Sequence, residues 1–435
     1  MITSINRIKK YVTSSFAKTT LIYTVSSFLN SATPFLLLPI LTRYLSTEEY
    51  GIISMFNATA SIFLPFMGMS ISSAVLRKLA DKDDEGNHKY VFNALIVAAI
   101  ATVFFTCIVF ASRYYISKWT AINEIYLLYV ILFTVATYLC DLTLVMFQIR
   151  DMPKRYGTFQ NLCTLLNLLL SVLFVVFLKY GLLGRILGLC ISKFIFAIIG
   201  ILYIVFSYKI KAIISIKYIK DIVVNFGLPL IPTNIKATVL TYTDRLFITN
   251  MISVSETGIY AVGNQFSLPI LLLAQAFNLA YVPWLYRKLN ENDEQYKYKI
   301  VKYTYIYFGS ILLIALMWSF LAKPLMTIIS GKAYEFSTTY VFWLSLGYAF
   351  TAMHMMVVNY IYYTKKTKLY AVITIVVIFS NIILNYFLIG ANGSVGAAQA
   401  TLIANVISFV LTWILASRVW KMPWLSFRKN GGGIK

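Results

Sequence analysis

Long apolar runs recur along the whole chain, and short polar stretches separate them. A helix needs about 20 apolar residues to cross the hydrocarbon core of a bilayer. By that length the chain holds about twelve candidate membrane helices. They lie near residues 21–41, 52–73, 91–111, 125–147, 157–178, 182–206, 226–248, 258–284, 300–321, 337–362, 369–388 and 395–417. The sequence therefore predicts an all-α polytopic membrane protein.

The composition excludes a water-soluble fold. Only 12% of the residues are charged and 59% are hydrophobic, whereas globular domains carry about 25% charged residues. The formal net charge of +22 would suggest nucleic acid in a soluble protein. Here the basic residues stand in short gaps between apolar runs, where they orient helices and contact anionic membrane lipids. We therefore expect no nucleic-acid partner.

The cysteines show no ligand pattern. All of them fall inside apolar runs: Cys107, Cys140, Cys163 and Cys190. Metal sites and disulfide frameworks have characteristic Cys and His spacings that are missing from this sequence. We expect neither a metal nor a cofactor.

The basic residues also indicate an orientation. With a cytoplasmic N-terminus, the segments on the cytoplasmic side hold roughly four times as many Lys and Arg as the opposite segments. This bias runs from end to end and would be lost if one helix were missed midway. Both termini are therefore predicted to be cytoplasmic.

The two halves of the sequence resemble each other. Segment 44–57 aligns without gaps on segment 251–264. Its identities pair as Ser46/Ser253, Glu49/Glu256, Gly51/Gly258, Ile52/Ile259 and Asn57/Asn264. Further along, Arg77–Lys78–Leu79 recurs as Arg287–Lys288–Leu289, and Gly181-x-x-Gly184 recurs as Gly393-x-x-Gly396. An offset of six helices keeps both repeats in one orientation, which predicts two parallel six-helix lobes around a central cleft.

The predicted lobes define three parts. Residues 1–206 form the N-lobe, residues 207–225 a cytoplasmic linker, and residues 226–435 the C-lobe with a short tail. Lysines alternate with isoleucines in the linker. That pattern fits an interfacial helix, and it fits a solvated loop equally well.

The chain resembles the Wzx-type polysaccharide flippases of the MOP superfamily, which also contains the MATE exporters. Three segments carry the resemblance: Pro39–Gly51, Thr243–Tyr260 and Leu384–Thr401. The resemblance implies a bacterial inner-membrane flippase that moves an undecaprenyl-pyrophosphate-linked oligosaccharide outward for O-antigen or capsule assembly. A glycan polymerase and a chain-length regulator are then candidate partners.

Two lysines lie near the middle of predicted membrane helices, Lys193 in the sixth and Lys236 in the seventh. A charge at mid-membrane is costly and is usually functional. One hypothesis is that both face the cleft and attract the pyrophosphate or acidic sugars of the cargo. The alternative is that both are structural and bind backbone carbonyls or a buried carboxylate.

Other charged residues offer further candidates. Asp141, in the fourth helix, could exchange a proton during antiport or pair with Lys193. Asp244 is a second coupling candidate, although its neighbour Arg245 invites local neutralisation. Arg43 could add positive potential at the periplasmic mouth or anchor its helix at the interface.

Polar residues are expected to line the cleft. Asn234, Thr238, Thr241 and Arg245 recur at helical spacing, and Thr233 belongs to a second, interrupted stripe. Candidates from other helices are Asn30, Asn264 and Gln275. Polar residues also hold membrane helices together, so a structural role remains open.

Two other functions compete. A MATE-like exporter of organic cations should have carboxylates in its cleft, whereas lysines outnumber acids at mid-depth here. A membrane glycan polymerase or ligase of the same pathway usually needs a large extramembrane loop or an acidic pair. Because the loops are short and the predicted spans contain no carboxylate pair, we expect no enzymatic activity.

Overall fold

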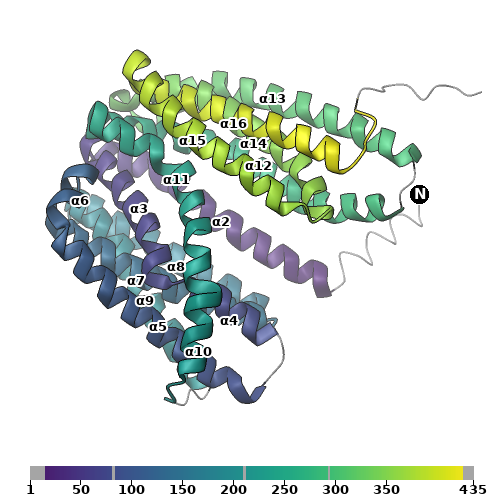
Figure 1. Cartoon of the computed structure of the whole chain (residues 1–435). Helices are drawn as coiled ribbons and strands as arrows, with labels where there is room; N and C mark the ends of the chain where they lie inside the picture. The colour runs from purple at the N-terminus through teal and green to yellow at the C-terminus, as the bar shows by residue number, and fades with distance from the viewer. Residues whose placement is uncertain (1–14, 81–83, 209–211, 292–293, 425–435) are drawn as a thin grey trace, which may run out of the picture. The chain divides into compact units, whose positions relative to one another are not determined.

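The structure is a computed structural model that describes residues 15–80, 84–208, 212–291 and 294–424. The described residues form helices joined by short turns, with no strand among them (Figure 1). Residues 1–14 and 425–435 lie outside the described part, so the predicted cytoplasmic location of the termini stays a prediction. The predicted all-α architecture is confirmed.

Each predicted apolar run corresponds to one long helix in the described part of the chain. These helices are α2 (Ser15–Tyr44), α3 (Thr47–Gly68), α5 (Asp84–Ala111), α7 (Glu124–Ile149), α8 (Pro153–Val172), α9 (Gly181–Tyr208), α11 (Leu228–Met251), α12 (Val254–Glu291), α13 (Glu294–Ser330), α14 (Ser337–Tyr363), α15 (Thr367–Asn392) and α16 (Ser394–Val419). Ten of the described helices are long and apolar enough to cross a membrane. The other two long helices are α2 and α11, so twelve crossings stay a prediction.

Shorter elements connect the long helices. They are α4 (Ile71–Ala80), α6 (Arg113–Thr120), α10 (Ile216–Asp221), the π-helical turns η1 (Leu173–Phe177) and η2 (Ile222–Gly227), and the 3₁₀ turn η3 (Lys332–Tyr334). In the expected linker, α10 continues through η2 into α11, while residues 209–211 lie outside the described part. The π turn adds a residue to the helical ladder at this point, a common cause of a local bend.

The chain divides into two compact units, Met1–Tyr242 and Thr243–Lys435. The division falls within α11, so the first part of this helix belongs to the first unit. The predicted lobes with their separate linker stay a prediction.

In the first unit, α7 packs against α3, α4 and α9, while α8 packs against α2 and α9 (Figure 1). Aromatic side chains fill the space between α7, α8 and α9. The rings of Phe147 and Phe159 lie 5.8 Å apart, and those of Phe159 and Phe196 lie 5.1 Å apart. Both pairs meet edge to face, the arrangement that the quadrupoles of aromatic rings favour.

In the second unit, α14 contacts α12, α13 and α16, and α15 covers α16 (Figure 1). Its core again contains aromatic clusters. Phe308 of α13 lies edge to face against Phe409 and Trp413 of α16, at 5.3 and 5.7 Å between ring centroids. Burial of these large side chains holds the helices of this unit together.

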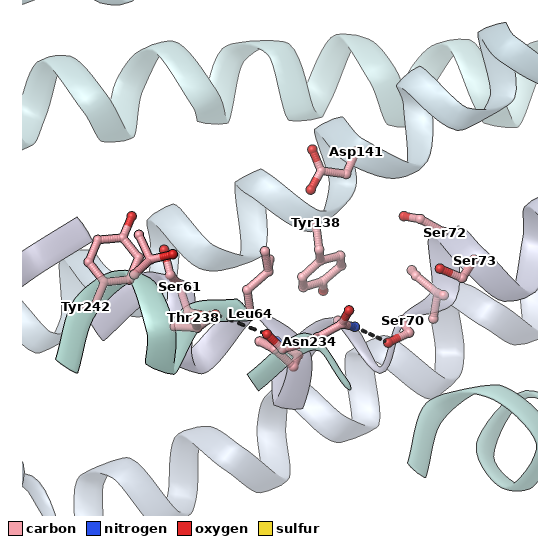
Figure 2. A pocket seen from close by; sticks show the side chains of 14 residues that line it. Ser61, Leu64, Ser70, Ser72, Ser73, Tyr138, Asp141, Asn234, Thr238 and Tyr242 are labelled. Atoms are coloured by element: carbon pink, nitrogen blue, oxygen red, sulfur yellow. Dashed lines mark hydrogen bonds between the residues drawn. The ribbon is translucent and has the colours of Figure 1, made fainter. Parts of the chain in front are cut away.

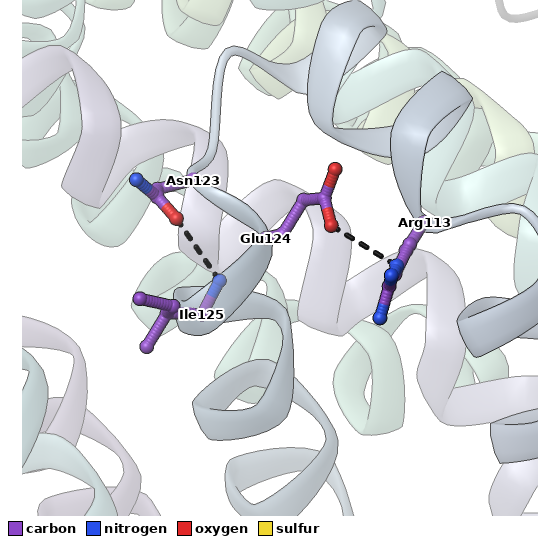
Figure 3. Close-up of polar contacts among 4 residues, drawn as sticks. All are labelled: Arg113, Asn123, Glu124 and Ile125. Carbon is purple, nitrogen blue, oxygen red and sulfur yellow. Dashed lines mark hydrogen bonds and ion pairs between the residues drawn. The ribbon is translucent and has the colours of Figure 1, made fainter.

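A sharp turn joins α6 to α7 (Figure 3). Ala121 takes a left-handed backbone conformation there, with φ of 55°. The side chain of Asn123 accepts a hydrogen bond from the Ile125 N–H at 3.0 Å and so caps α7. Across the turn, Arg113 Nε lies 3.0 Å from Glu124 Oε2. Both charged side chains are exposed, so this ion pair stabilises the fold little.

Candidate functional site

A cavity of about 460 Å³ lies within the first unit (Figure 2). We name it the polar cavity for the polar side chains among its lining residues, although carbon atoms make up most of its surface. Its walls come from α3, the α3–α4 turn, α4, α7 and the first part of α11. The lining residues with polar side chains are Ser61, Ser70, Ser72, Ser73, Tyr138, Asp141, Asn234, Thr238, Thr241 and Tyr242. The cavity therefore offers many neutral hydrogen-bonding groups and a single carboxylate among its lining residues.

The turn between α3 and α4 brings serines to the cavity. Met69 and Ser70 both have left-handed backbone conformations, with φ of 45° and 51°. Such conformations are uncommon for residues other than glycine and cost free energy. Asn234 Nδ2 donates to Ser70 Oγ at 2.9 Å, and Figure 2 shows the two side chains pointing toward each other. A bond from α11 thus holds the turn at the cavity wall.

Helix α11 presents a polar face to the cavity. Asn234, Thr238 and Thr241, which the sequence places at helical spacing, all line it. The Thr238 hydroxyl lies within hydrogen-bond distance of the carbonyl oxygens of Asn234, at 3.3 Å, and Ser61, at 3.4 Å. Hydroxyls that bond to a carbonyl of their own helix keep their lone pairs available to a ligand.

Asp141 lies on the cavity wall contributed by α7, one turn from Tyr138 (Figure 2). Lys193 of α9 is close enough to interact electrostatically with the carboxylate, although it is not among the lining residues. The Cys140 thiol donates to the Lys193 carbonyl oxygen at 3.6 Å, which packs α7 against α9 at this level. Proton exchange by Asp141 and its pairing with Lys193 are both consistent with this arrangement.

The remaining candidates of the first unit lie on α2 and α11. Asn30 is exposed and accepts a hydrogen bond from the Thr164 hydroxyl at 2.8 Å, so it joins α2 to α8. Arg43 is exposed in the last turn of α2. The side chains of Thr233 and Lys236 lie outside the described residues, and the roles expected for them stay predictions.

In the second unit, Asp244 is buried. Its carboxylate accepts hydrogen bonds from the Tyr260 hydroxyl and from the backbone N–H of Arg245, the latter at 2.8 Å. The Arg245 guanidinium also acts on it electrostatically. Local neutralisation by Arg245 and a role of Asp244 in coupling both stay predictions.

The two polar candidates on α12 differ in exposure. Asn264 is buried and accepts a hydrogen bond from the Tyr348 hydroxyl at 2.8 Å, which ties α12 to α14. Gln275 is exposed on the same helix. Asn264 thus has a structural contact within the second unit.

Sequence reasoning missed one buried cation. Arg185 falls near the start of the predicted helix 182–206 and was not among the candidate residues; it lies in α9 and is only 6% exposed. Its Nη1 donates to Asn167 Oδ1 at 2.8 Å and to the Ser171 hydroxyl, both on α8. The available signal was the four-residue spacing of Asn167 and Ser171 inside an otherwise apolar run.

Ser70, Ser72 and Ser73 were also missed, because they lie at the end of the predicted helix 52–73. In the structure α3 ends at Gly68, Ser70 lies in the turn and α4 begins at Ile71. The cavity that they line can hydrogen-bond a hydroxyl-rich ligand from several sides. Among the described residues, no group of three or more His, Cys, Asp or Glu side chains could hold a metal ion.

Comparison with known sequences places the chain among known families. The sequence model described as "Polysaccharide biosynthesis protein" matches residues 16–289, and the MatE model matches residues 229–387. A protein of the Lsg locus of Haemophilus influenzae is 25% identical over 360 residues, which cover 81% of this chain and 86% of that protein.

Solved structures share the fold. The lipid II flippase MurJ in its inward closed conformation matches with a TM-score of 0.75 at 16% identity, over 92% of this chain and 87% of that one. An inward-facing multidrug resistance MATE family transporter of the MOP superfamily matches with a TM-score of 0.65 at 16% identity, over 91% and 94% of the two chains. The expected resemblance to MOP-superfamily proteins is thereby confirmed, as is a multi-pass membrane location.

The first family model covers more than half of the sequence, and the described helices have the fold of MOP-superfamily transporters. The chain therefore belongs to the polysaccharide biosynthesis protein family.

Proposed function

We propose that the protein is a flippase that moves an undecaprenyl-pyrophosphate-linked oligosaccharide from the cytoplasmic to the periplasmic leaflet of the inner membrane by alternating access, for O-antigen or capsule assembly. The observation that carries this proposal is the open cavity lined by many hydroxyl side chains in a member of a polysaccharide biosynthesis family. An oligosaccharide needs many neutral hydrogen-bonding partners when it leaves water.

The chemistry of the cavity supports a sugar cargo in particular. Serine, threonine and tyrosine hydroxyls both donate and accept, so they can match the hydroxyls of a sugar in many orientations. The aromatic ring of Tyr138 lies on the cavity wall that α7 contributes (Figure 2). The lipid tail of the cargo would stay in the bilayer, where the chain exposes apolar side chains.

The pyrophosphate would need positive charge. Lys193 and Lys236 are our candidates for that role, with Arg43 and Arg245 as further sources of positive potential. Asp141 on the cavity wall and the buried Asp244 are the candidates for coupling transport to an ion or proton gradient.

The test uses a strain from which the chromosomal copy has been deleted. We expect loss of surface polysaccharide and accumulation of complete lipid-linked units on the cytoplasmic side of the membrane. Two measurements read this out: staining of the surface glycan, and labelling of lipid-linked sugars in right-side-out and inverted vesicles. Export of single units to the periplasmic face without polymerisation would contradict a flippase and favour a polymerase.

A second candidate is a MATE-like exporter of small molecules, favoured by the match of the MatE model to residues 229–387. Against it, lysines outnumber acids at mid-depth of the predicted helices, although the cavity lining itself holds one carboxylate and no Lys or Arg. Increased sensitivity of the deletion strain to cationic dyes, with normal surface polysaccharide, would support this alternative.

A further inference from the structure

A second cavity in the first unit is basic. It has a volume of about 620 Å³ and lies between α4, α5, α10 and η2. Four cationic residues line it: Arg77, Lys78, Lys217 and Lys220. The sequence places all of them on the predicted cytoplasmic side. One acid, Asp221, is among the lining residues, so the lining carries an excess of positive charge.

Asp221 is engaged by neutral groups. The Tyr90 hydroxyl donates to its Oδ2 at 2.9 Å, and Asn225 Nδ2 donates to its Oδ1 at 2.6 Å. Lys217 and Lys220 are exposed, and neither forms an ion pair within the described part of the chain. The carboxylate thus anchors the wall, and these two lysines remain available to an anionic ligand.

The wall that carries the lysines is firmly held. Asn93 of α5 is fully buried, and its side chain donates to the Ile213 carbonyl at 2.9 Å and accepts from the Ser215 N–H at 2.8 Å. The rings of Tyr90 and Tyr218 meet edge to face at 5.4 Å. These contacts fix the segment before α10 against α5 (Figure 1), so the basic cavity is preformed.

An apolar groove of about 510 Å³ adjoins the same segment, because α5, α10 and η2 contribute to both. Its lining side chains come from α3, the α3–α4 turn, α5, α10, η2 and α11, and include Val97, Ile100, Ala101, Phe104, Ile219 and Val223. None of these side chains is polar. Ile100 and Phe104 are 62% and 68% exposed, which is what a lipid-facing surface requires.

The basic cavity and the apolar groove are lined by some of the same helices, but by different faces and different turns of those helices. Ile219 and Val223 face the groove, whereas Lys217 and Lys220 face the basic cavity, so the α10–η2 segment is amphipathic. On α5, Tyr90 lines the basic cavity and Val97 lines the groove, about 10 Å further along the helix at 1.5 Å per residue. The basic cavity therefore lies about 10 Å along α5 from the apolar groove. This arrangement matches an anionic lipid, whose charged headgroup and apolar acyl chain are adjacent.

We propose that this composite surface binds an anionic phospholipid of the cytoplasmic leaflet, with its phosphate in the basic cavity and an acyl chain along the groove. Lysines at the membrane surface attract anionic headgroups, and the abundant phospholipids of the bilayer contact the exposed side chains of α5 at all times. This goes beyond cargo transport, because the occupant is a constituent of the membrane.

Helix α4 lines both the basic cavity and the polar cavity. Ser72 and Ser73 at its start line the polar cavity, while Arg77 and Lys78 near its end line the basic cavity. A phospholipid headgroup held by the end of α4 would restrain the whole ten-residue helix. The lipid would therefore stabilise the wall of the polar cavity.

The experiment measures lipid binding to the purified, delipidated full chain by native mass spectrometry and by the thermal unfolding midpoint. The probes are phosphatidylglycerol and phosphatidylcholine with the same acyl chains. The variant is K217Q/K220Q, and the matched control is K366Q/K368Q, two exposed lysines elsewhere in the chain. We expect phosphatidylglycerol to bind the wild type and the control, and to bind K217Q/K220Q about 30-fold more weakly.

Further arms distinguish the occupants. Ala101→Phe fills the groove, so it should weaken phosphatidylglycerol binding without changing the charge of the basic cavity. Equal binding of phosphatidylcholine, or equal loss in the control variant, would overturn the proposal. Displacement of phosphatidylglycerol by inorganic pyrophosphate at low concentration would indicate an aqueous anion site, and preferential retention of a polyprenyl pyrophosphate would indicate a cargo site; either result overturns it.

Discussion

Glu49 Oε1 accepts a hydrogen bond from the backbone N–H of Leu182 at 3.1 Å, although 133 residues separate them in the chain. Leu182 is the second residue of α9, where the backbone N–H groups have no partner within the helix. The carboxylate is thus placed where the helix dipole favours negative charge. A side chain in the first turn of α3 therefore caps α9, the sixth long helix.

The second unit repeats this relationship with the matched residues. Glu256 Oε2 accepts hydrogen bonds from the Ser394 hydroxyl at 2.9 Å and from the Tyr340 hydroxyl at 2.8 Å. Ser394 is the first residue of α16, as Leu182 stands at the start of α9. Gly181 and Gly393, which precede them, both have positive φ, 53° and 60°. The internal repeat in the sequence thus corresponds to a repeated contact in each unit.

Glu49→Ala should destabilise the first unit. The substitution leaves the Leu182 N–H without its charged partner, and it also removes the bond that the Ser46 backbone N–H donates to Glu49 Oε2 at the start of α3. Hydrogen bonds to charged groups contribute about 1.5–3 kcal/mol. We expect the free energy of unfolding in detergent to fall by about that amount, measured by denaturant titration.

The neighbouring Glu48 provides the control, because its side chain is exposed at the same turn. Glu48→Ala should leave the unfolding curve nearly unchanged. Equal destabilisation by the two substitutions would show that the Glu49–Leu182 bond contributes little.

The helices were predictable because the physics that forms them is local. A run of about 20 apolar residues must become a helix in a bilayer, since every backbone polar group needs an internal partner there. The positions of the cavity walls were less predictable. The left-handed conformations of the α3–α4 turn are at Met69 and Ser70, whereas the glycine of this segment is Gly68, one residue earlier. The geometry of this turn depends on contacts with α11, which are distant in the sequence.

The candidate site was predictable in part for the same reason. The polar face of α11 is visible as helical spacing of Asn234, Thr238 and Thr241. Asp141 was identified because a lone carboxylate inside an apolar run is costly in a bilayer and is therefore usually functional. Arg185 stands near the start of its predicted helix, where a cation often anchors a helix at the interface. Its buried position depends on Asn167 and Ser171 of the preceding helix, a contact that the sequence does not show.

Asp141→Asn should abolish coupling to a proton gradient while cargo binding persists. The amide keeps the shape of the side chain and its hydrogen-bonding capacity, but it cannot take up a proton at neutral pH. The measurement is transport into proteoliposomes with and without an imposed pH gradient. A structural ion pair with Lys193 makes the opposite prediction: Asp141→Asn would lower thermal stability, and adding Lys193→Gln would restore it.

Lys193→Gln should reduce transport while the amount of protein in the membrane is unchanged. Glutamine retains most of the length of the side chain but removes the charge that would attract a pyrophosphate. The readout is restoration of surface polysaccharide in the deletion strain, with membrane levels checked by immunoblot. Lys323→Gln is the matched control, because Lys323 is exposed at the far end of α13. The same experiment applies to Lys236, and full transport by both glutamine variants would contradict the cationic-site hypothesis.

Thr238→Val should weaken cargo recognition without unfolding the first unit. Valine has nearly the shape of threonine, so the substitution removes a hydroxyl from the cavity wall and leaves the packing of α11 in place. Loss of one neutral hydrogen bond corresponds to about 0.5–1.5 kcal/mol, or roughly a two- to tenfold rise in the apparent KM. The apparent KM is measured from the uptake of a lipid-linked oligosaccharide by inverted vesicles.

Thr137→Val is the control, because the Thr137 hydroxyl donates to the carbonyl of Phe133 in its own helix and Thr137 does not line the cavity. An unchanged KM in Thr238→Val, or an equal rise in both variants, would remove the cavity from the cargo path.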